Sequence, residues 1–240
     1  MTKRLILSLF IVAASWLCPR AAAAQHDLSG VWMRQQPGNG FSEDPPPPLT
    51  AWALERFAAN RPTVGPHAAL DANDPTVYCA PPGVPYVLAV PTPFELVHAN
   101  GEVIQLFEYN HFVRRIHTDG RGHPDDLRTT GAYEWLGHSI GRWEGDTFVI
   151  DTIGFNDVTW LDRVGHPHSE ALHLVERLRR PTPDTLEYSV MVDDPRAYNA
   201  PWTGRMLFVR RPDWEILEHV CTTTANSYDA FKEKAWKAAQ

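Results

Sequence analysis

The sequence has few sulfur-containing residues, with three cysteines and four methionines among 240 residues. After its first two dozen residues it lacks any apolar run of about 20 residues, the length that a membrane-spanning helix needs. It contains no P-loop and no glycine fingerprint for dinucleotides. Ser139 in GHSIG resembles a nucleophile elbow, but its surroundings predict strand–turn–strand rather than strand–turn–helix. These absences argue against a nucleotide-binding enzyme, an elbow-type serine hydrolase and a helical membrane protein.

What is present begins with an export signal. Lys3 and Arg4 form a positive start, residues 5–18 are mostly apolar, and small residues then fit an A-x-A cleavage site before Gln25. The apolar part is too short to span a bilayer comfortably. We therefore predict a signal peptide over residues 1–24. The mature protein is expected to be soluble, exported to the periplasm or outside the cell, and not inserted in a membrane.

Removal of the signal makes an acidic chain more acidic. Residues 1–24 contain three basic residues and no acidic one, so the formal net charge changes from −7 to about −10. Such a charge argues against nucleic acid and anionic lipid surfaces as partners. The partner that we expect is a small organic molecule. About 216 residues remain, which is enough for one large β domain with its own core.

Two cysteines remain in the mature chain, Cys79 and Cys221. In an oxidising compartment two such cysteines most often pair, and we predict this disulfide. It would close most of the mature chain into one loop and stabilise the fold by roughly 4–5 kcal/mol in the loop-entropy model. A redox or metal-binding role is the weaker alternative, because the cysteines are not in a CxxC arrangement.

The first part of the mature chain, residues 25–94, is predicted to be an extension with little regular structure. Thr50 can cap a short helix that Pro62 would end. Residues 61–93 are rich in proline and show no periodicity. Because this stretch is long for a loop, we expect it to pack on the domain surface or cover a pocket.

Apolar and polar residues alternate over residues 95–225, which predicts a series of strands. Strands that recur with short turns and almost no helical pattern indicate an antiparallel meander, closed as a barrel or stacked as a sandwich. A short amphipathic helix is expected over residues 226–240. The turn signals are Asn100-Gly101, Asp119-Gly120, Glu144 to Asp146, Pro181 to Asp184 and Arg211 to Asp213.

We favour a barrel because polar residues interrupt both faces of several strands. Phe148 and Thr152 share one face of a predicted strand, whereas Asp151 lies on the other face between Val149 and Ile153. A carboxylate at such a position is costly in a dry core and natural in a wet barrel lumen. The predicted fold is therefore an all-β, antiparallel β-barrel with a proline-rich N-terminal wrapping segment and a short C-terminal helix.

Three blocks of the sequence, RRIHTDGRGHP, GHSIGRWEGDTFVIDTIGFND and PHSEALHLVERLRR, resemble a large family of exported bacterial proteins that are mostly described as uncharacterised. The resemblance spans roughly residues 26–225. It implies a calycin-like, lipocalin-like barrel and no established reaction. Phe148 departs from the family blocks, in which an aliphatic residue is usual. The matching positions are Arg115, Asp119, Arg121, Trp143, Asp146, Asp151, Asn156, Trp160, His173, Glu176 and Arg177.

His173 and Glu176 can be interpreted in two ways. In a helix they would lie three residues apart on one face, as in a carboxylate–histidine metal pair. The period-two alternation of Leu172, Leu174 and Leu178 favours a strand instead, in which the two side chains point apart. A single metal held by both residues is then not expected.

In the strand, Glu176 lies on an otherwise apolar face, so its carboxylate must be paired, protonated or functional. Arg115 from a neighbouring strand is the candidate for a structural ion pair. The alternative is that Glu176 is an acid or base in a pocket. His173 is likewise either a hydrogen-bonded structural residue or a group that exchanges protons with a ligand.

Loop histidines raise the question of a metal. His166 and His168 stand in HPH, and His123 and His138 lie on predicted turns. Loops at one barrel mouth could bring several of them together, and three neutral imidazoles bind zinc or copper well. The spacing is not specific enough to predict such a site. No cofactor is therefore predicted, and a transition metal held by His123, His166 and His168 is the weaker alternative.

Several aromatic and polar residues are candidates for contact with a ligand. Aromatic residues in a barrel usually fill the core, but they can also line a site for a flat or sugar-like ligand. The candidates are Trp143, Trp160, Asn156, Arg177 and His111.

The leading hypothesis is an exported enzyme that uses general acid/base chemistry, such as hydrolysis, elimination or isomerisation, on a small molecule in a polar barrel pocket. His173 would transfer protons, Asp151 or Glu176 would orient it, and Arg115 would hold an anionic group. The alternative is a lipocalin-like periplasmic carrier of a hydrophobic small molecule. A third hypothesis is a structural or interaction protein of the cell envelope.

Overall fold

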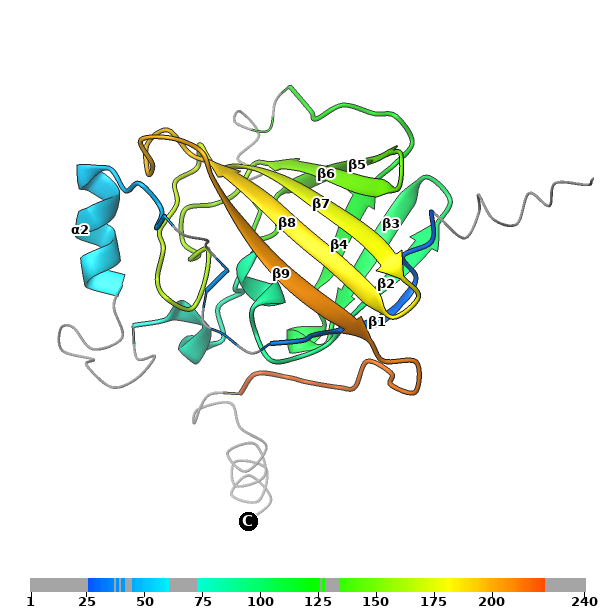
Figure 1. Cartoon of the computed structure of the whole chain (residues 1–240). Coiled ribbons are helices and arrows are strands. Elements are labelled where there is room, and N and C mark those ends of the chain that lie inside the picture. Colours follow the sequence, from blue (N-terminus) through cyan, green and yellow to red (C-terminus); the bar gives the residue numbers. More distant parts are fainter. Residues whose placement is uncertain are drawn as a thin grey trace, which may run out of the picture.

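The protein is a closed barrel of nine strands in the computed structural model, which describes residues 26–36, 38, 40–41, 45–60, 73–125, 127 and 134–222 (Figure 1). The strands follow one another around the barrel in chain order, and β1 pairs with both β2 and β9. The predicted all-β barrel is therefore confirmed. The predicted signal peptide and C-terminal helix lie outside the described residues.

The elements have the following bounds. The strands are β1 (Gly30–Arg34), β2 (Phe94–Ala99), β3 (Glu102–Phe107), β4 (Val113–His117), β5 (His138–Glu144), β6 (Thr147–Ile153), β7 (His173–Thr182), β8 (Thr185–Asp193) and β9 (Trp202–Arg210). The helical elements are α2 (Ala51–Asn60) and the short 3-10 helices η1 (Pro75–Tyr78), η2 (Tyr86–Leu88) and η3 (Tyr109–His111).

The hairpin turns follow the predicted turn residues in three places. Asn100-Gly101 joins β2 to β3, Glu144 to Asp146 joins β5 to β6, and Pro181 to Asp184 joins β7 to β8. The hairpin predicted at Arg211 to Asp213 is wrong, because no strand returns after β9 in the described residues. The edge of β9 that such a strand would need is already paired with β1, with Trp32 opposite Arg210.

The prediction of a fully antiparallel barrel also needs a correction, since β4 and β5 pair in parallel. A long connection begins at the turn Asp119-Gly120 and separates β4 from β5, because a parallel pair cannot be joined by a tight hairpin. Only Ile116 with Ser139 and His117 with Ile140 are in register. The barrel wall therefore has a weakly paired seam between β4 and β5.

The barrel interior is packed with apolar and aromatic side chains. Trp32, Phe107 and Phe208 are almost fully buried, and Phe94 meets Phe208 edge to face at 5.0 Å between ring centroids. The expectation of a wet lumen that contains Asp151 is therefore wrong. Strand alternation points the buried Phe148 and Thr152 inward and Asp151 outward, where 26% of its side chain is exposed.

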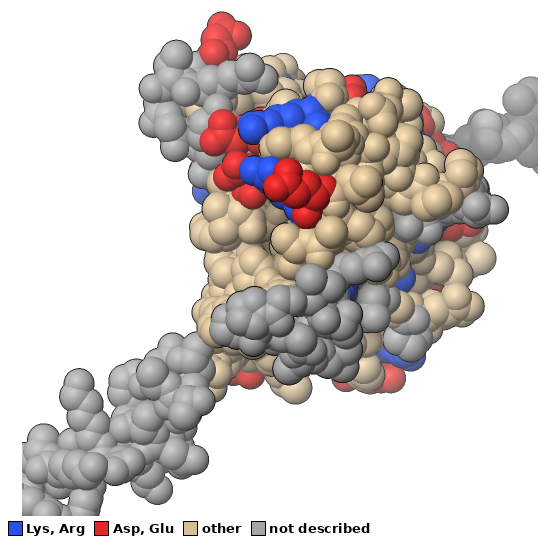
Figure 2. Space-filling view, turned by 90° about the vertical axis from the view of Figure 1, so that its left-hand side faces the viewer, with Lys and Arg blue, Asp and Glu red and all other residues tan. Residues whose placement is uncertain are grey.

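The helix predicted after Thr50 is confirmed. The Thr50 hydroxyl accepts a hydrogen bond from the backbone N–H of Ala53 at 3.2 Å, and α2 ends at Asn60. In Figure 1, α2 stands at one side of the barrel. Seen from that side, acidic and basic side chains lie next to one another, and much of the face is uncharged (Figure 2).

Part of the proline-rich segment belongs to the core, whereas η1 within it has no buried residue. Tyr86, Val87 and Leu88 of η2 are each at most 3% exposed and belong to the main hydrophobic cluster. The predicted disulfide is present: Cys79, just after η1, is bonded to Cys221, with 5.5 Å between their Cα atoms. It joins this segment to the chain that follows β9. No helix among the described residues has both the length and the apolar character for a membrane crossing.

Candidate active site

A polar cluster lies sealed inside the barrel, around an ion pair between Arg114 of β4 and Glu176 of β7. Arg114 Nη1 donates to Glu176 Oε1 at 3.1 Å, Nη2 donates to Oε2, and both side chains are 1% exposed. The predicted buried carboxylate on an apolar face is thus confirmed, but the predicted partner Arg115 is wrong. Arg115 points outward and pairs with Glu102, because adjacent residues of a strand face opposite sides.

The remaining hydrogen bonds of this cluster are satisfied by neighbouring strands. Arg114 Nε donates to Ser139 Oγ at 3.0 Å, and Nη2 donates to Thr152 Oγ1 at 2.8 Å. The Tyr188 hydroxyl donates to Glu176 Oε1 at 3.0 Å, and burial holds the pKa of this phenol well above its ordinary value, so it remains a donor. A buried charge pair with this many partners is a structural network rather than a reactive one.

A second polar cluster lies on the outer face of the same strands, around Asp151 of β6. Its Oδ1 atom receives hydrogen bonds from His173 Nε2 at 2.9 Å and from His123 Nε2 at 3.0 Å. The predicted proximity of His173 and Asp151 is confirmed. His173 and Glu176 point to opposite sides of β7, as the strand interpretation requires.

The second histidine extends the cluster toward β4 and β5. His123 Nδ1 lies 2.8 Å from His138 Nδ1, and the ring of His138 lies 5.4 Å from the ring of His117. Of the four loop histidines, His123 and His138 therefore meet, next to Asp151. Asp151, His123 and His138 form a continuous chain of hydrogen bonds, which we call the relay.

The donor and acceptor properties of the three side chains set the direction of each hydrogen bond in the relay. The carboxylate of Asp151 only accepts hydrogen bonds, so His123 donates from Nε2. A neutral His123 is then an acceptor at Nδ1, and His138 donates to it from its own Nδ1. This leaves a lone pair on Nε2 of His138, for which the described residues provide no hydrogen-bond donor. The relay therefore presents His138 as a base.

His138 lies in the wall of a cavity of about 470 Å³ at the seam, which we call the seam pocket. Its lining comes from β4, from the start of β5 and from the residues just before each strand, where the two strands share only two paired positions. Its described lining residues are Phe112, Val113, Arg114, Arg115, His117, Glu134, Trp135, Leu136, Gly137, His138 and Ser139.

The electrostatic surroundings of His138 favour its neutral form. Its pKa is lowered by burial and by the neighbouring His123, His117 and Arg121. The imidazole is thus unprotonated at neutral pH and available to take up a proton.

The three histidines of the weaker metal hypothesis are not brought together. His166 binds the buried Asp162 at 2.8 Å and stacks on Phe57, and His168 binds Thr159 at 2.6 Å. Both are buried structural residues with partners other than His123. No group of three or more His, Cys, Asp or Glu side chains with metal-binding geometry occurs among the described residues.

The predicted ligand-binding residues are scattered. Trp160 is 5% exposed in the core, and Trp143 stacks on His26 at 4.5 Å. Asn156 caps a local turn by accepting from Val158 N, and exposed His111 accepts from the backbone N–H of His219.

Arg177 lies in a separate groove on the outer face of β7. No residue of this groove is shared with the lining of the seam pocket.

No family model, curated protein or solved structure matches the chain.

Sequence patterns did not indicate Arg114, which is adjacent to the predicted partner Arg115. The signal that could have identified it is its alternation with Ile116, a core residue. His138 was expected only among the loop histidines, and its place next to His123 depends on the loop that contains His123.

Proposed function

We propose that the protein is an exported enzyme that transfers protons on a small organic molecule bound in the seam pocket. The observation that supports this proposal is the relay from Asp151 through His123 to His138, a residue of the pocket wall whose Nε2 atom has no hydrogen-bond donor among the described residues. A base whose pKa lies below that of free histidine is suited to proton abstraction at neutral pH. Export is supported by the disulfide and by the predicted signal peptide.

In this proposal His138 is the catalytic base, and Asp151 and His123 are positioning residues. His173 shares the Asp151 carboxylate and holds it in place, rather than acting as the proton shuttle that the sequence suggested. Glu176 belongs to the sealed ion pair and takes no part. Arg115, with 64% of its side chain exposed at the pocket, is available to contact an anionic group of the substrate.

The residues around His138 limit the kinds of reaction that the pocket can support. The hydroxyl of Ser139 is engaged by Arg114 and Thr152 in the interior, so it is not an available nucleophile for covalent catalysis. Proton transfer then leads to isomerisation, elimination, or hydrolysis by a water that His138 activates. Apolar side chains such as Trp135 and Leu136 in the lining suit a substrate with an apolar or planar body.

A carrier of a hydrophobic molecule is the second candidate, favoured by the same apolar lining. Its ligand would occupy the seam pocket, since the interior is filled by aromatic side chains such as Trp32 and Phe208. A carrier needs no relay, so the loss of His138 as a base would leave the binding of the hydrophobic ligand intact.

The test uses the mature, disulfide-bonded protein in D₂O with a panel of small molecules. The panel contains ketones with an acidic C–H bond, β-substituted acids and lactones. NMR follows deuterium uptake and product formation. We expect His138→Gln to reduce the rate by about 100-fold or more, and His123→Ala by a smaller factor. His26→Gln, at an exposed histidine outside the pocket, is the matched control.

Wild-type turnover in His138→Gln would reject the proposal. A compound that binds equally well to both proteins and is never converted would establish the carrier instead.

A further inference from the structure

The wall of the seam pocket contains a second histidine, His117, which takes no part in the relay. The centroid of its ring lies 5.4 Å from that of His138. His117 is the last residue of β4, and strand alternation points it to the same outer face as Arg115. Two imidazoles from neighbouring strands therefore border the same cavity.

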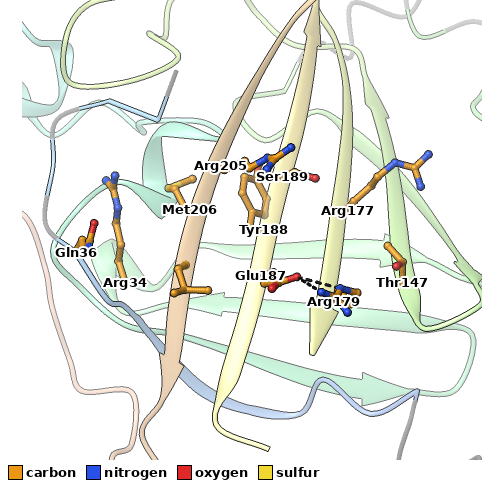
Figure 3. Close-up of a pocket in the computed structure, with 11 residues that line it drawn as sticks. Arg34, Gln36, Thr147, Arg177, Arg179, Glu187, Tyr188, Ser189, Arg205 and Met206 are labelled. Carbon is orange, nitrogen blue, oxygen red and sulfur yellow. Dashed lines mark hydrogen bonds and ion pairs between the residues drawn. The ribbon is translucent and has the colours of Figure 1, made fainter. Parts of the chain in front are cut away.

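The separate groove over β7, β8 and β9 differs from the seam pocket, because the arginines of β7 in it are matched by carboxylates (Figure 3). Arg179 pairs with Glu187 at 2.7 Å, and Arg177 pairs with Glu144 at 2.9 Å. For the ring nitrogens of His117, in contrast, the described part of the chain provides no hydrogen-bond partner. These nitrogens can therefore form their hydrogen bonds with a ligand or with water.

Of the two rings, His138 is the one that stays neutral. Burial lowers its pKa, and the charges of His123, His117 and Arg121 lower it further. Two adjacent imidazolium ions would repel each other, so a proton that the pair takes up resides on His117 rather than on His138. The pocket wall then presents a base and a proton donor side by side.

Charged side chains from every neighbouring element surround His117. Carboxylates and guanidinium groups keep their charges from about pH 6.5 to about pH 9, whereas an imidazole loses its proton in or near this range. A pH dependence of ligand binding between these limits would therefore come from the imidazoles. The charged side chains are Glu102 of β3, which is opposite His117, Arg115 of β4, Asp119 and Arg121 of the loop after β4, and Glu134 before β5.

We propose that His117 is a second catalytic residue and that the substrate is an enolisable carbonyl compound, an inference that rests on the function proposed above for His138. His138 takes a proton from the carbon next to the carbonyl group. The electron pair of that C–H bond forms a carbon–carbon double bond, and the carbonyl oxygen takes up the proton of His117. His138 then returns its proton to a different carbon, His117 takes back the proton from oxygen, and an isomer is released.

A carbonyl compound suits the seam pocket in shape and in charge. Its oxygen and the hydrogen to be removed belong to adjacent carbon atoms, so one small molecule can reach both rings. The cavity of about 470 Å³, with Trp135 and Leu136 in its wall, accommodates a planar and largely apolar body. Because an enolate carries its negative charge on oxygen, binding of a stable planar oxyanion should depend on the protonated ring of His117.

Equilibrium binding of pentafluorophenolate, a planar oxyanion that resembles an enolate, tests the role of His117 separately from turnover. Fluorine NMR follows binding to the mature, disulfide-bonded protein from about pH 6.5 to about pH 9. We expect the affinity to fall as the pH rises, because the protonated imidazole loses its proton. His117→Gln should bind about tenfold more weakly and without this pH dependence, whereas His138→Gln should keep the pH dependence. His26→Gln, at an exposed histidine outside the pocket, is the matched control.

Circular dichroism and thermal unfolding of each variant would establish that the barrel is intact. The inference is overturned if the wild-type protein does not bind the phenolate below about 1 mM, the range of weak non-specific association. It is also overturned if His117→Gln and His26→Gln bind the phenolate equally well at every pH.

Turnover of the β,γ-unsaturated isomer of cyclohexenone, followed by NMR, separates this inference from the proposed function. We expect His117→Gln to reduce the rate of isomerisation by about 10-fold to 100-fold and to remove its decline at high pH. A wild-type rate in His117→Gln, with loss of turnover in His138→Gln, would reject the role of His117 and leave the base in place. A wild-type rate in His138→Gln would reject the base, and the role of His117 with it.

Discussion

Two polar clusters in this barrel are built from the same strands and differ in almost every physical respect. Ser139 and Thr152 face inward, where Arg114 and Glu176 are sealed from water. Their sequence neighbours His138 and Asp151 face outward and form the relay with a loop histidine. Side-chain alternation along β5 and β6 alone separates the two clusters.

The comparison shows how to distinguish a structural network from a reactive one. In the inner cluster, hydrogen bonds with four neighbouring side chains, those of Gln105, Ser139, Thr152 and Tyr188, hold the ion pair. In the outer cluster, His138 lines a cavity, and its Nε2 atom has no hydrogen-bond donor among the described residues. Satisfaction of hydrogen bonds, rather than the number of charged groups, therefore identifies the candidate active site.

The largest effect is expected from Glu176→Gln, which leaves Arg114 as a buried, uncompensated charge. The free energy of unfolding should fall by about 3–5 kcal/mol in denaturant titrations. The control is Glu102→Gln, which removes the partner of the exposed Arg115 and should cost less than about 1 kcal/mol. Equal losses in the two variants would show that the inner pair is not the structural anchor described here.

A smaller loss is expected from Tyr188→Phe, which removes one donor from Glu176 without changing the ring. The unfolding free energy should fall by about 1–3 kcal/mol, since a buried carboxylate oxygen loses a hydrogen bond. Tyr78→Phe, at a tyrosine that is 62% exposed, provides the comparison. A neutral effect of Tyr188→Phe would indicate that the network has spare donors.

Stability is expected to depend on pH through histidines with lowered pKa values. Burial lowers the pKa of His138, His98 and His168 in the folded protein. The unfolded chain therefore binds more protons below about pH 6.5, and the unfolding free energy should decrease as the pH falls from 6.5 toward the folded pKa values.

Chemical denaturation between pH 8 and pH 5 measures this dependence, and His138→Gln should flatten part of it. The charged neighbours of His138 that enter this balance are His117, His123 and Arg121. Stability that is constant or rises on acidification would contradict the assignment of His138 as a neutral base.

The smallest change in stability is expected from Asp151→Asn. The carboxylate is 26% exposed and solvated, so the unfolding free energy should change by less than about 1 kcal/mol. The tautomers of His123 and His138 should nevertheless change, because an amide no longer demands a donor from His123. Nitrogen-15 NMR of the imidazoles would detect this change. A destabilisation as large as that of Glu176→Gln would make Asp151 a structural residue.

Local patterns predicted much of the fold. The Thr50 cap, the turns at Asn100-Gly101 and Glu144 to Asp146, and the disulfide between Cys79 and Cys221 depend on residue type and short-range geometry. Patterns also showed that His173 and Glu176 point apart. These features are decided within a few residues, apart from the disulfide, which follows because only two cysteines remain.

Patterns failed where the answer depends on another part of the chain. The choice between Arg114 and Arg115 depends on which face of β4 meets the interior, and one residue of register reverses it. The parallel pairing of β4 and β5, and hence the seam pocket, results from the long connection after β4. The missing hairpin after β9 reflects closure of the barrel by β1.

The sequence by itself determined the strands, their alternation, most of their turns and the candidates for a buried carboxylate and for reactive histidines. These depend on the side-chain period of a strand and on local backbone preferences, which each segment contains. Only the tertiary structure decided which face became the interior, which arginine neutralised Glu176, and which loop brought His123 between Asp151 and His138. Those outcomes depend on closure of the barrel, where segments distant in sequence compete for the same edges and the same buried volume.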